Sequence, residues 1–264
     1  MGARAIARDW RLGRLSADFS ATMPDQPVWP VEPALLRPGA MPKRGRMGSE
    51  RSRIAMLHAL AHIEYVAIAL ALDIVGRFGR LFPRAFTDDW LRVAAEEAMH
   101  FALLDRRLRV AGSRYGALPA HEGLWSAAAA TAHDATARLA IVPMVLEARG
   151  LDVTPATIRR FREQGDEPSA RILGRIMADE IRHVAAGTRW FNWACDERKI
   201  DSVKHWQTLV SRHFRGGLKP PFNASARDKA GLTQEYYTAV ATLTFPPQEG
   251  SNAGTKNILA LGGS

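Results

Sequence analysis

The sequence predicts an all-α protein whose four long helices form a bundle, and two observations support this class. Apolar residues recur at three- and four-residue spacing in four separate segments, which is the period of an amphipathic helix. Each of these segments carries one glutamate in the middle of its apolar stripe: Glu64, Glu97, Glu147 and Glu180. No segment shows convincing strand alternation, so we expect helices and connections only.

Residues 1–48 are expected to form an extended N-terminal arm. They are rich in Pro, Gly and Arg and show no clean hydrophobic period. Trp29 and the adjacent pair Leu35 and Leu36 are the side chains that we expect to anchor this arm by burial. The arm would then lie on the bundle rather than form a domain.

The first two long helices have clear start and stop signals. Ser49 is a favourable N-cap for the first, and glycines at 76 and 79 should end it. Thr87 is expected to cap the second helix, with acidic residues in the first turn, at the positive end of the helix dipole. Gly112 should stop this second helix.

The third and fourth helices are interrupted by prolines. Residues 113–123 should connect to a third helix over 124–149, in which Pro143 must break a backbone hydrogen bond close to the central glutamate. A kink is expected over 150–155, after which the helix resumes. This next helical piece should start at Thr154 and Pro155, because proline is tolerated in a first turn. The fourth helix should begin near Pro168.

These elements predict three parts of the chain. The four-helix bundle is expected over residues 49–200, and a C-terminal arm with a flexible tail over 201–264. A short final helix is expected over 232–243, within that arm. The segment 248–264, rich in Gly, Ser and Asn, should be the flexible tail.

Composition excludes several classes of protein. The chain has 264 residues, of which 47% are hydrophobic, so a sizeable core is expected and wholesale disorder is not. Its single cysteine, Cys195, excludes a disulfide framework within the chain and suits a reducing compartment. No run of about 18 apolar residues is free of charges, so no membrane span is expected. The cytoplasm is the expected location.

The net charge of +9 favours anionic partners such as nucleic acid. No RNA-binding motif accompanies the arginines. The plainer alternative is that surplus arginines solvate the exposed faces of helices. Both interpretations remain open from the sequence.

The four glutamates predict a centre with two metal ions. Two of them belong to Glu-x-x-His motifs, in which a carboxylate and an imidazole share one helix face. The same 33-residue interval separates the two glutamates of each helix pair. Four buried carboxylates need compensating charge, which two divalent cations would supply. The predicted ligands are Glu64, Glu97, His100, Glu147, Glu180 and His183.

Neighbouring residues have weaker interpretations. Glu96 and Asp179 each precede a ligand glutamate, where they either accept a hydrogen bond from the imidazole of the opposite helix or are solvated charges. His58 and His62 share a helix face, but not the face of Glu64. A polar contact to an arm is the alternative to a place near the metals. The six predicted ligands could also form a hydrogen-bond network without metal, although four unpaired carboxylates disfavour that alternative.

Four segments together resemble the ferritin-like domain of unknown function 455 family of bacteria. They are SERSRIAMLHALAHIE, FTDDWLRVAAEEAMHFALL, GLWSAAAATAHDATARLAIVPMVLEARGLDVTP and ADEIRHVAAGTRWF. The resemblance covers about residues 30–225, and PMVLEARGLDVTP is its most specific motif. It implies a ferritin-like four-helix bundle with a di-metal centre held by the six ligands already named, and it implies no particular substrate.

The resulting expectation is a non-haem oxidase or hydroxylase with two iron ions, in which manganese or a mixed pair is also compatible. Its partners would be dioxygen, an unknown reductant, and a small-molecule substrate or a modified tRNA. A homodimer is compatible with this expectation. One alternative is an iron-binding or ferroxidase protein. Another is a tRNA-modifying hydroxylase that uses the basic surface.

Overall fold

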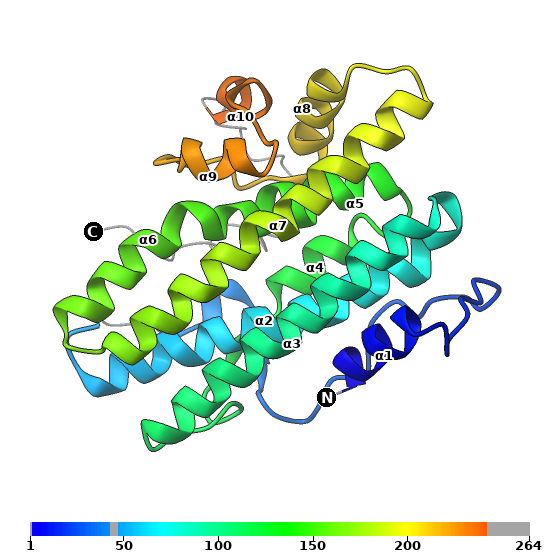
Figure 1. Cartoon of the computed structure of the whole chain (residues 1–264). Helices are drawn as coiled ribbons and strands as arrows, with labels where there is room; N and C mark the ends of the chain where they lie inside the picture. The colour runs from blue at the N-terminus through cyan, green and yellow to red at the C-terminus, as the bar shows by residue number, and fades with distance from the viewer. Residues whose placement is uncertain (1, 43–46, 242–264) are drawn as a thin grey trace. The chain divides into compact units, whose positions relative to one another are not determined.

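The computed structural model describes residues 2–42 and 47–241, and these residues are mostly helical (Figure 1). They divide into two compact units. The first comprises the described residues up to 36 together with 40–125, and the second comprises 37–39 and 126–241. The all-α class is confirmed, with one small exception. Strand in the described ranges is limited to β1 (Leu35–Leu36) and β2 (Ala120–His121), which pair in parallel.

The first unit is built on a hairpin of two long helices, α2 (Glu50–Phe78) and α3 (Arg84–Val110). The predicted cap is confirmed, because the Ser49 side chain accepts a hydrogen bond from the Ser52 backbone N–H. The turn η2 (Gly79–Leu81) joins the helices, and this short connection makes them antiparallel neighbours. The second helix begins four residues earlier than predicted, because Pro83 rather than Thr87 occupies its N-cap position.

The prediction of an extended N-terminal arm is wrong for residues 2–11, which form helix α1 (Gly2–Arg11). Ala3 and Trp10 lie seven residues apart on one face and are both buried. This face packs against α3, so tertiary burial stabilises a helix that is too short to persist alone. The expected anchor Trp29 is only partly buried, with its ring close to those of Tyr65 and Trp125.

The second unit is centred on the packing of two helices, α6 (Ala148–Glu163) and α7 (Glu167–Glu197). Helix α7 begins near Pro168, as the sequence predicted, and Asp166 provides an N-cap that was not predicted. The other elements are α4 (Gly123–Ala129), which crosses the unit boundary, α5 (Ala135–Ile141), η3 (Val142–Glu147), α8 (Ser202–His213), α9 (Ala224–Lys229) and α10 (Gln234–Ala241).

The third predicted helix is not continuous. Asp134 caps a new helix, α5, because its carboxylate accepts hydrogen bonds from two backbone N–H groups of the next turn. The predicted distortion at Pro143 is confirmed, since η3 is a π-helical turn. The helix resumes as predicted, but the interruption expected over 150–155 is absent, because α6 runs through these residues with Pro155 in its interior. Pro155 leaves the Leu151 carbonyl without its helical donor, and Asn223 Nδ2 donates to that oxygen at 3.1 Å instead.

The C-terminal arm is more helical than predicted. The final short helix is confirmed as α10, while α8 was not expected. Trp206 of α8 is fully buried and meets the ring of Tyr236 edge-on, so tertiary packing stabilises this helix. The predicted flexible tail, 248–264, lies outside the described residues.

One helical segment, Glu50–Leu81, is long and apolar enough to cross a membrane by length and composition alone. Its most apolar stretch has a mean hydropathy of 1.7, and 56% of that stretch is buried inside the chain. Core helices of soluble proteins meet the same criteria, so this segment gives no clear membrane span. Within the described residues no other helix meets these criteria.

A glycine in α7 sets its approach to the π-helical turn. A Cβ added at Gly187 would lie 2.5 Å from both Cβ and Cγ of Pro143, closer than real side chains approach. We therefore expect Gly187→Ala to lower the free energy of unfolding by about 1–3 kcal/mol through overpacking. Urea unfolding followed by circular dichroism measures this change.

Gly174→Ala is the matched control on the same helix. A Cβ at position 174 meets nothing within 4 Å, and the residue is exposed. This substitution should raise the free energy of unfolding by up to about 1 kcal/mol, because alanine is the better helix former. Equal effects of the two substitutions would contradict the proposed close packing at Gly187.

Candidate metal centre

The first unit brings three predicted ligands together on the α2–α3 hairpin. Glu64 comes from the middle of α2, and Glu97 and His100 come from one face of α3. Their exposed fractions are 6%, 1% and 0%, so all three are removed from water. We call these three side chains the first half-site.

The imidazole of His100 lies between the two carboxylates. Its Nδ1 is 3.2 Å from Glu64 Oε2 and 3.4 Å from Glu97 Oε2. Burial alone would lower the pKa of His100, but hydrogen bonds to both glutamates and their negative charges outweigh burial and raise its pKa to about 11. Without metal, His100 is therefore a charged imidazolium held by two carboxylates.

These separations also fit a shared metal ion. Two donor atoms that each lie about 2.1 Å from one ion, in tetrahedral or octahedral geometry, are about 3.0–3.4 Å apart. The distances from His100 Nδ1 to both carboxylates fall within this range. Imidazole nitrogen and carboxylate oxygen are the donors that iron, manganese and zinc accept. A metal ion would then take the place of the His100 proton.

The second unit repeats part of this arrangement on α7. His183 is fully buried and Glu180 is 9% exposed, and His183 Nδ1 lies 3.5 Å from Glu180 Oε1. Glu147 ends the π-helical turn η3, which packs against α7. Unlike the other five predicted ligands, Glu147 is only partly buried. We call Glu147, Glu180 and His183 the second half-site.

The π-helical turn explains how a proline is accommodated one turn before Glu147. A π turn inserts an extra residue into the helix and shifts the side chains that follow around its axis. Pro143 lies at the start of this turn and packs against α7 at Gly187, one turn beyond His183. The packing of η3 on α7 thus sets the position from which Glu147 projects.

The side chains before the ligand glutamates have different surroundings. Asp179 is 2% exposed, and its two oxygens accept hydrogen bonds from Arg175 Nε at 2.7 Å and Arg182 Nη2 at 2.6 Å. Both arginines belong to the same helix as Asp179. Glu96 is partly buried on α3. The orienting role predicted for both acids stays a prediction.

His58 and His62 contact the connection that follows α3. Nε2 of His58 accepts a hydrogen bond from the Gly116 N–H at 3.0 Å. In His62, Nδ1 lies 2.9 Å from the Tyr115 hydroxyl and Nε2 lies 3.1 Å from the His121 carbonyl oxygen. Burial lowers the pKa of both histidines to about 4, so both are neutral near pH 7. They tie the connection to α2.

Within the part of the chain that the structure describes, one set of side chains could hold a metal ion. Its members are Glu64, Glu97, His100 and Glu180, all four of which are predicted ligands. The other two predicted ligands, Glu147 and His183, are not in this set. The fold and these clusters define a helical protein with a candidate carboxylate–imidazole metal centre of unassigned metal.

Comparison with known proteins identifies the family. Residues 1–238 match the family described as protein of unknown function DUF455, and the chain belongs to that family. An uncharacterized protein of Haemophilus influenzae is 41% identical over 225 residues, which cover 82% of this chain and 78% of that protein. No solved structure matches the chain.

Proposed function

We propose that the two half-sites meet in a ferritin-like four-helix bundle and hold two metal ions for an oxidase or hydroxylase reaction with dioxygen. The observation that carries this proposal is the His100 imidazole, buried between two carboxylates at donor separations suited to a shared ion. The second half-site offers the same residue types, again with a Glu-x-x-His motif on one helix. One glutamate from each of two helices and Glu-x-x-His from each of the other two is the ligand pattern of di-iron bundles.

Charge balance supports two ions rather than one. The half-sites together carry four carboxylates, whose formal charge matches two divalent cations. Glu64 and Glu97 would ligate one ion with His100, and Glu147 and Glu180 would ligate the other with His183.

The residues of the chain would have two tasks in this reaction. The carboxylates and the imidazoles would hold the ions, and burial of Glu97 and His100 would keep bulk water away from them. A bound iron pair supplies redox chemistry with dioxygen. Hydroxylation of a C–H bond would place one oxygen atom in the product and release the other as water, with two electrons and two protons from a reductant. We propose that this occurs in the cytoplasm.

Iron loading tests this proposal. Protein loaded anaerobically with ferrous iron and freed of excess should retain about two ions per chain, as measured by plasma emission spectrometry. After mixing with oxygenated buffer, oxygen consumption should occur in one fast phase and stop at about one dioxygen per chain. Manganese loading in parallel tests which metal the site prefers.

Three results would contradict the proposal or redirect it. Metal content well below one ion per chain would show that the chain does not hold the proposed metal centre. Two ions that remain ferrous for minutes in oxygenated buffer would argue for a structural metal. Continued oxidation that accumulates many ferric ions per chain would support iron storage or ferroxidase activity instead.

A further inference from the structure

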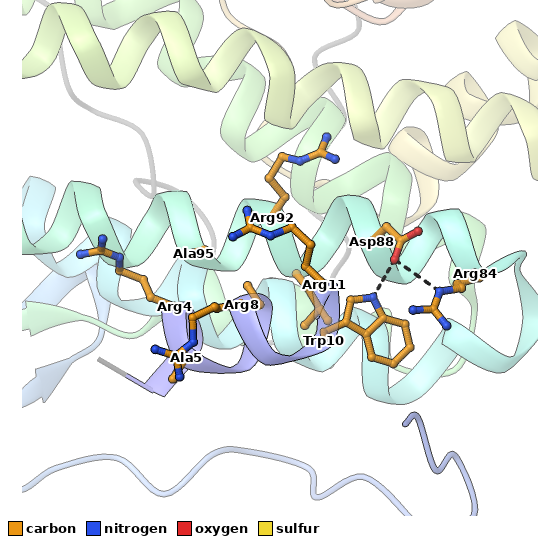
Figure 2. A pocket seen from close by; sticks show the side chains of 11 residues that line it. Arg4, Ala5, Arg8, Trp10, Arg11, Arg84, Asp88, Arg92 and Ala95 are labelled. Carbon is orange, nitrogen blue, oxygen red and sulfur yellow. Dashed lines mark hydrogen bonds and ion pairs between the residues drawn. The ribbon is translucent and has the colours of Figure 1, made fainter. Parts of the chain in front are cut away.

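The first unit contains a groove between α1 and α3 in which arginine is the most frequent lining residue. Its volume is about 890 Å³, and Figure 2 shows the side chains around it. Five of its lining residues are arginines, and one is an acid, Asp88. The arginines are Arg4, Arg8, Arg11, Arg84 and Arg92. The lining alone therefore has a formal charge of +4.

Several of these guanidinium groups are available to bind an anionic ligand. Arg4 and Arg11 form no ion pair with any side chain in the described ranges. Arg8 pairs with Asp9 at 2.9 Å and Arg92 with Asp89 at 3.5 Å, both arginines being well exposed. Exposed pairs of this kind contribute little stability, so an anion can compete for either arginine.

The groove has a fixed shape because α1 is attached firmly to α3. Trp10 is buried, and its Nε1 donates a hydrogen bond to Asp88 Oδ1 at 2.6 Å (Figure 2). The Arg84 guanidinium lies over the Trp10 ring, 4.5 Å from its centroid, and 3.8 Å from the same aspartate. These side chains of the groove are thus held in place before any ligand binds, which reduces the conformational entropy lost on binding.

We propose that this groove binds the backbone of a single-stranded nucleic acid through two or three successive phosphates. Arg4 to Arg11 spans about 10 Å along α1, and Arg84 to Arg92 spans about 12 Å along α3, at 1.5 Å per residue. Two rows of this length fit a linear series of phosphates better than one phosphate group. Guanidinium pairs with phosphate through two parallel hydrogen bonds, which favours arginine at such a site.

Two other anionic partners fit the observations less well. A membrane surface would need a continuous apolar helix face to insert, but Ala3 and Trp10 of α1 are buried against α3, which leaves Ile6 as the large apolar side chain that this helix exposes. A small polyphosphate would use only part of the two rows. The net charge of +9 over the whole chain also favours a long polyanion, which collects charge beyond the groove.

Fluorescence anisotropy with a labelled 12-nucleotide single strand, as RNA and as DNA, tests the proposal. The full chain should bind at low salt, with affinity falling as salt rises. Arg4→Gln/Arg11→Gln should weaken binding about tenfold or more and make the slope of log K against log salt shallower by about 1.4, the value for two lost phosphate contacts. Inorganic tripolyphosphate should compete only weakly.

Arg51→Gln/Arg106→Gln is the matched control. It removes the same charge from exposed arginines of the first unit that do not line the groove. Its binding should stay within about twofold of the unchanged chain. An equal loss in both double variants would overturn the proposal in favour of diffuse charge. Tripolyphosphate binding as tight as that of the strand, or binding only to vesicles of anionic lipid, would overturn it as well.

Discussion

Glu97→Gln is expected to reduce bound iron from about two ions per chain to one or fewer. Glutamine keeps the size and hydrogen-bonding ability of the side chain but removes the negative charge that a cation needs. Glu97 is 1% exposed, so water cannot replace the lost ligand easily. Plasma emission spectrometry after anaerobic loading measures the change, and we expect loss of at least half of the bound iron.

Glu180→Gln should have the same effect from the second unit, because this residue belongs to the set that could hold a metal ion. The double variant should retain almost no iron. Glu163→Gln on α6 is the matched control, since Glu163 is exposed at the end of its helix, and it should load fully. Urea unfolding of each unloaded variant separates lost metal binding from lost folding.

The iron content of these variants also tests whether the two units cooperate in one centre. If the half-sites join, each single substitution should weaken binding of both ions, because the remaining ligands lose a shared carboxylate. If they are separate, each substitution should remove at most the iron of its own unit. Full loading of the double variant would exclude the ligand assignment altogether.

The features that the sequence predicts well are those encoded within one or two helical turns. Ser49 caps α2 through the backbone of the next turn, and Pro168 lies in the first turn of α7. The Glu-x-x-His spacing places each pair on one helix face, whatever packs against it. The first half-site follows from this spacing and from the α2–α3 hairpin. That all six ligands converge on one centre stays a prediction.

The features that the sequence did not predict depend on contacts between distant residues. Helix α6 continues through Pro155 because Asn223, far along the chain, donates a hydrogen bond to the Leu151 carbonyl. Helix α1 persists because Trp10 is buried and bonded to Asp88. Local propensity favours a helix break at Pro155 and an irregular segment in place of α1. Tertiary contacts override both tendencies.

The arginine groove was also missed, although one signal for it is present in the sequence. Arg4, Arg8 and Arg11 recur at helical spacing, next to a face that carries Ala3 and Trp10. An amphipathic pattern of this kind indicates a helix with one basic face. Residues 1–48 taken together are rich in proline and glycine, and this composition obscured the helical pattern. Most of these prolines and glycines follow Arg11.

Asp152→Ala is expected to lower the free energy of unfolding by about 3–5 kcal/mol, because it leaves a buried positive charge without its partner. The Arg227 guanidinium is 1% exposed and donates to Asp152 from Nε at 2.9 Å and from Nη2 at 2.7 Å. It also lies over the rings of Phe222 and Tyr237. These contacts fix α9 and its flanking residues against α6, so hydrogen exchange should rise there first.

Two further variants separate the charge effect from packing. Asp228→Ala, on the exposed side of α9, should change stability by less than about 0.5 kcal/mol. Asp152→Leu/Arg227→Met replaces the ion pair with apolar side chains and should recover most of the loss, because no buried charge remains. Recovery should be incomplete, since the Asn223 N–H also donates to Asp152 Oδ1 at 2.9 Å and would lose that acceptor. A double variant no more stable than Asp152→Ala would show that hydrogen-bond geometry at Asp152, rather than unpaired charge, controls stability at this position.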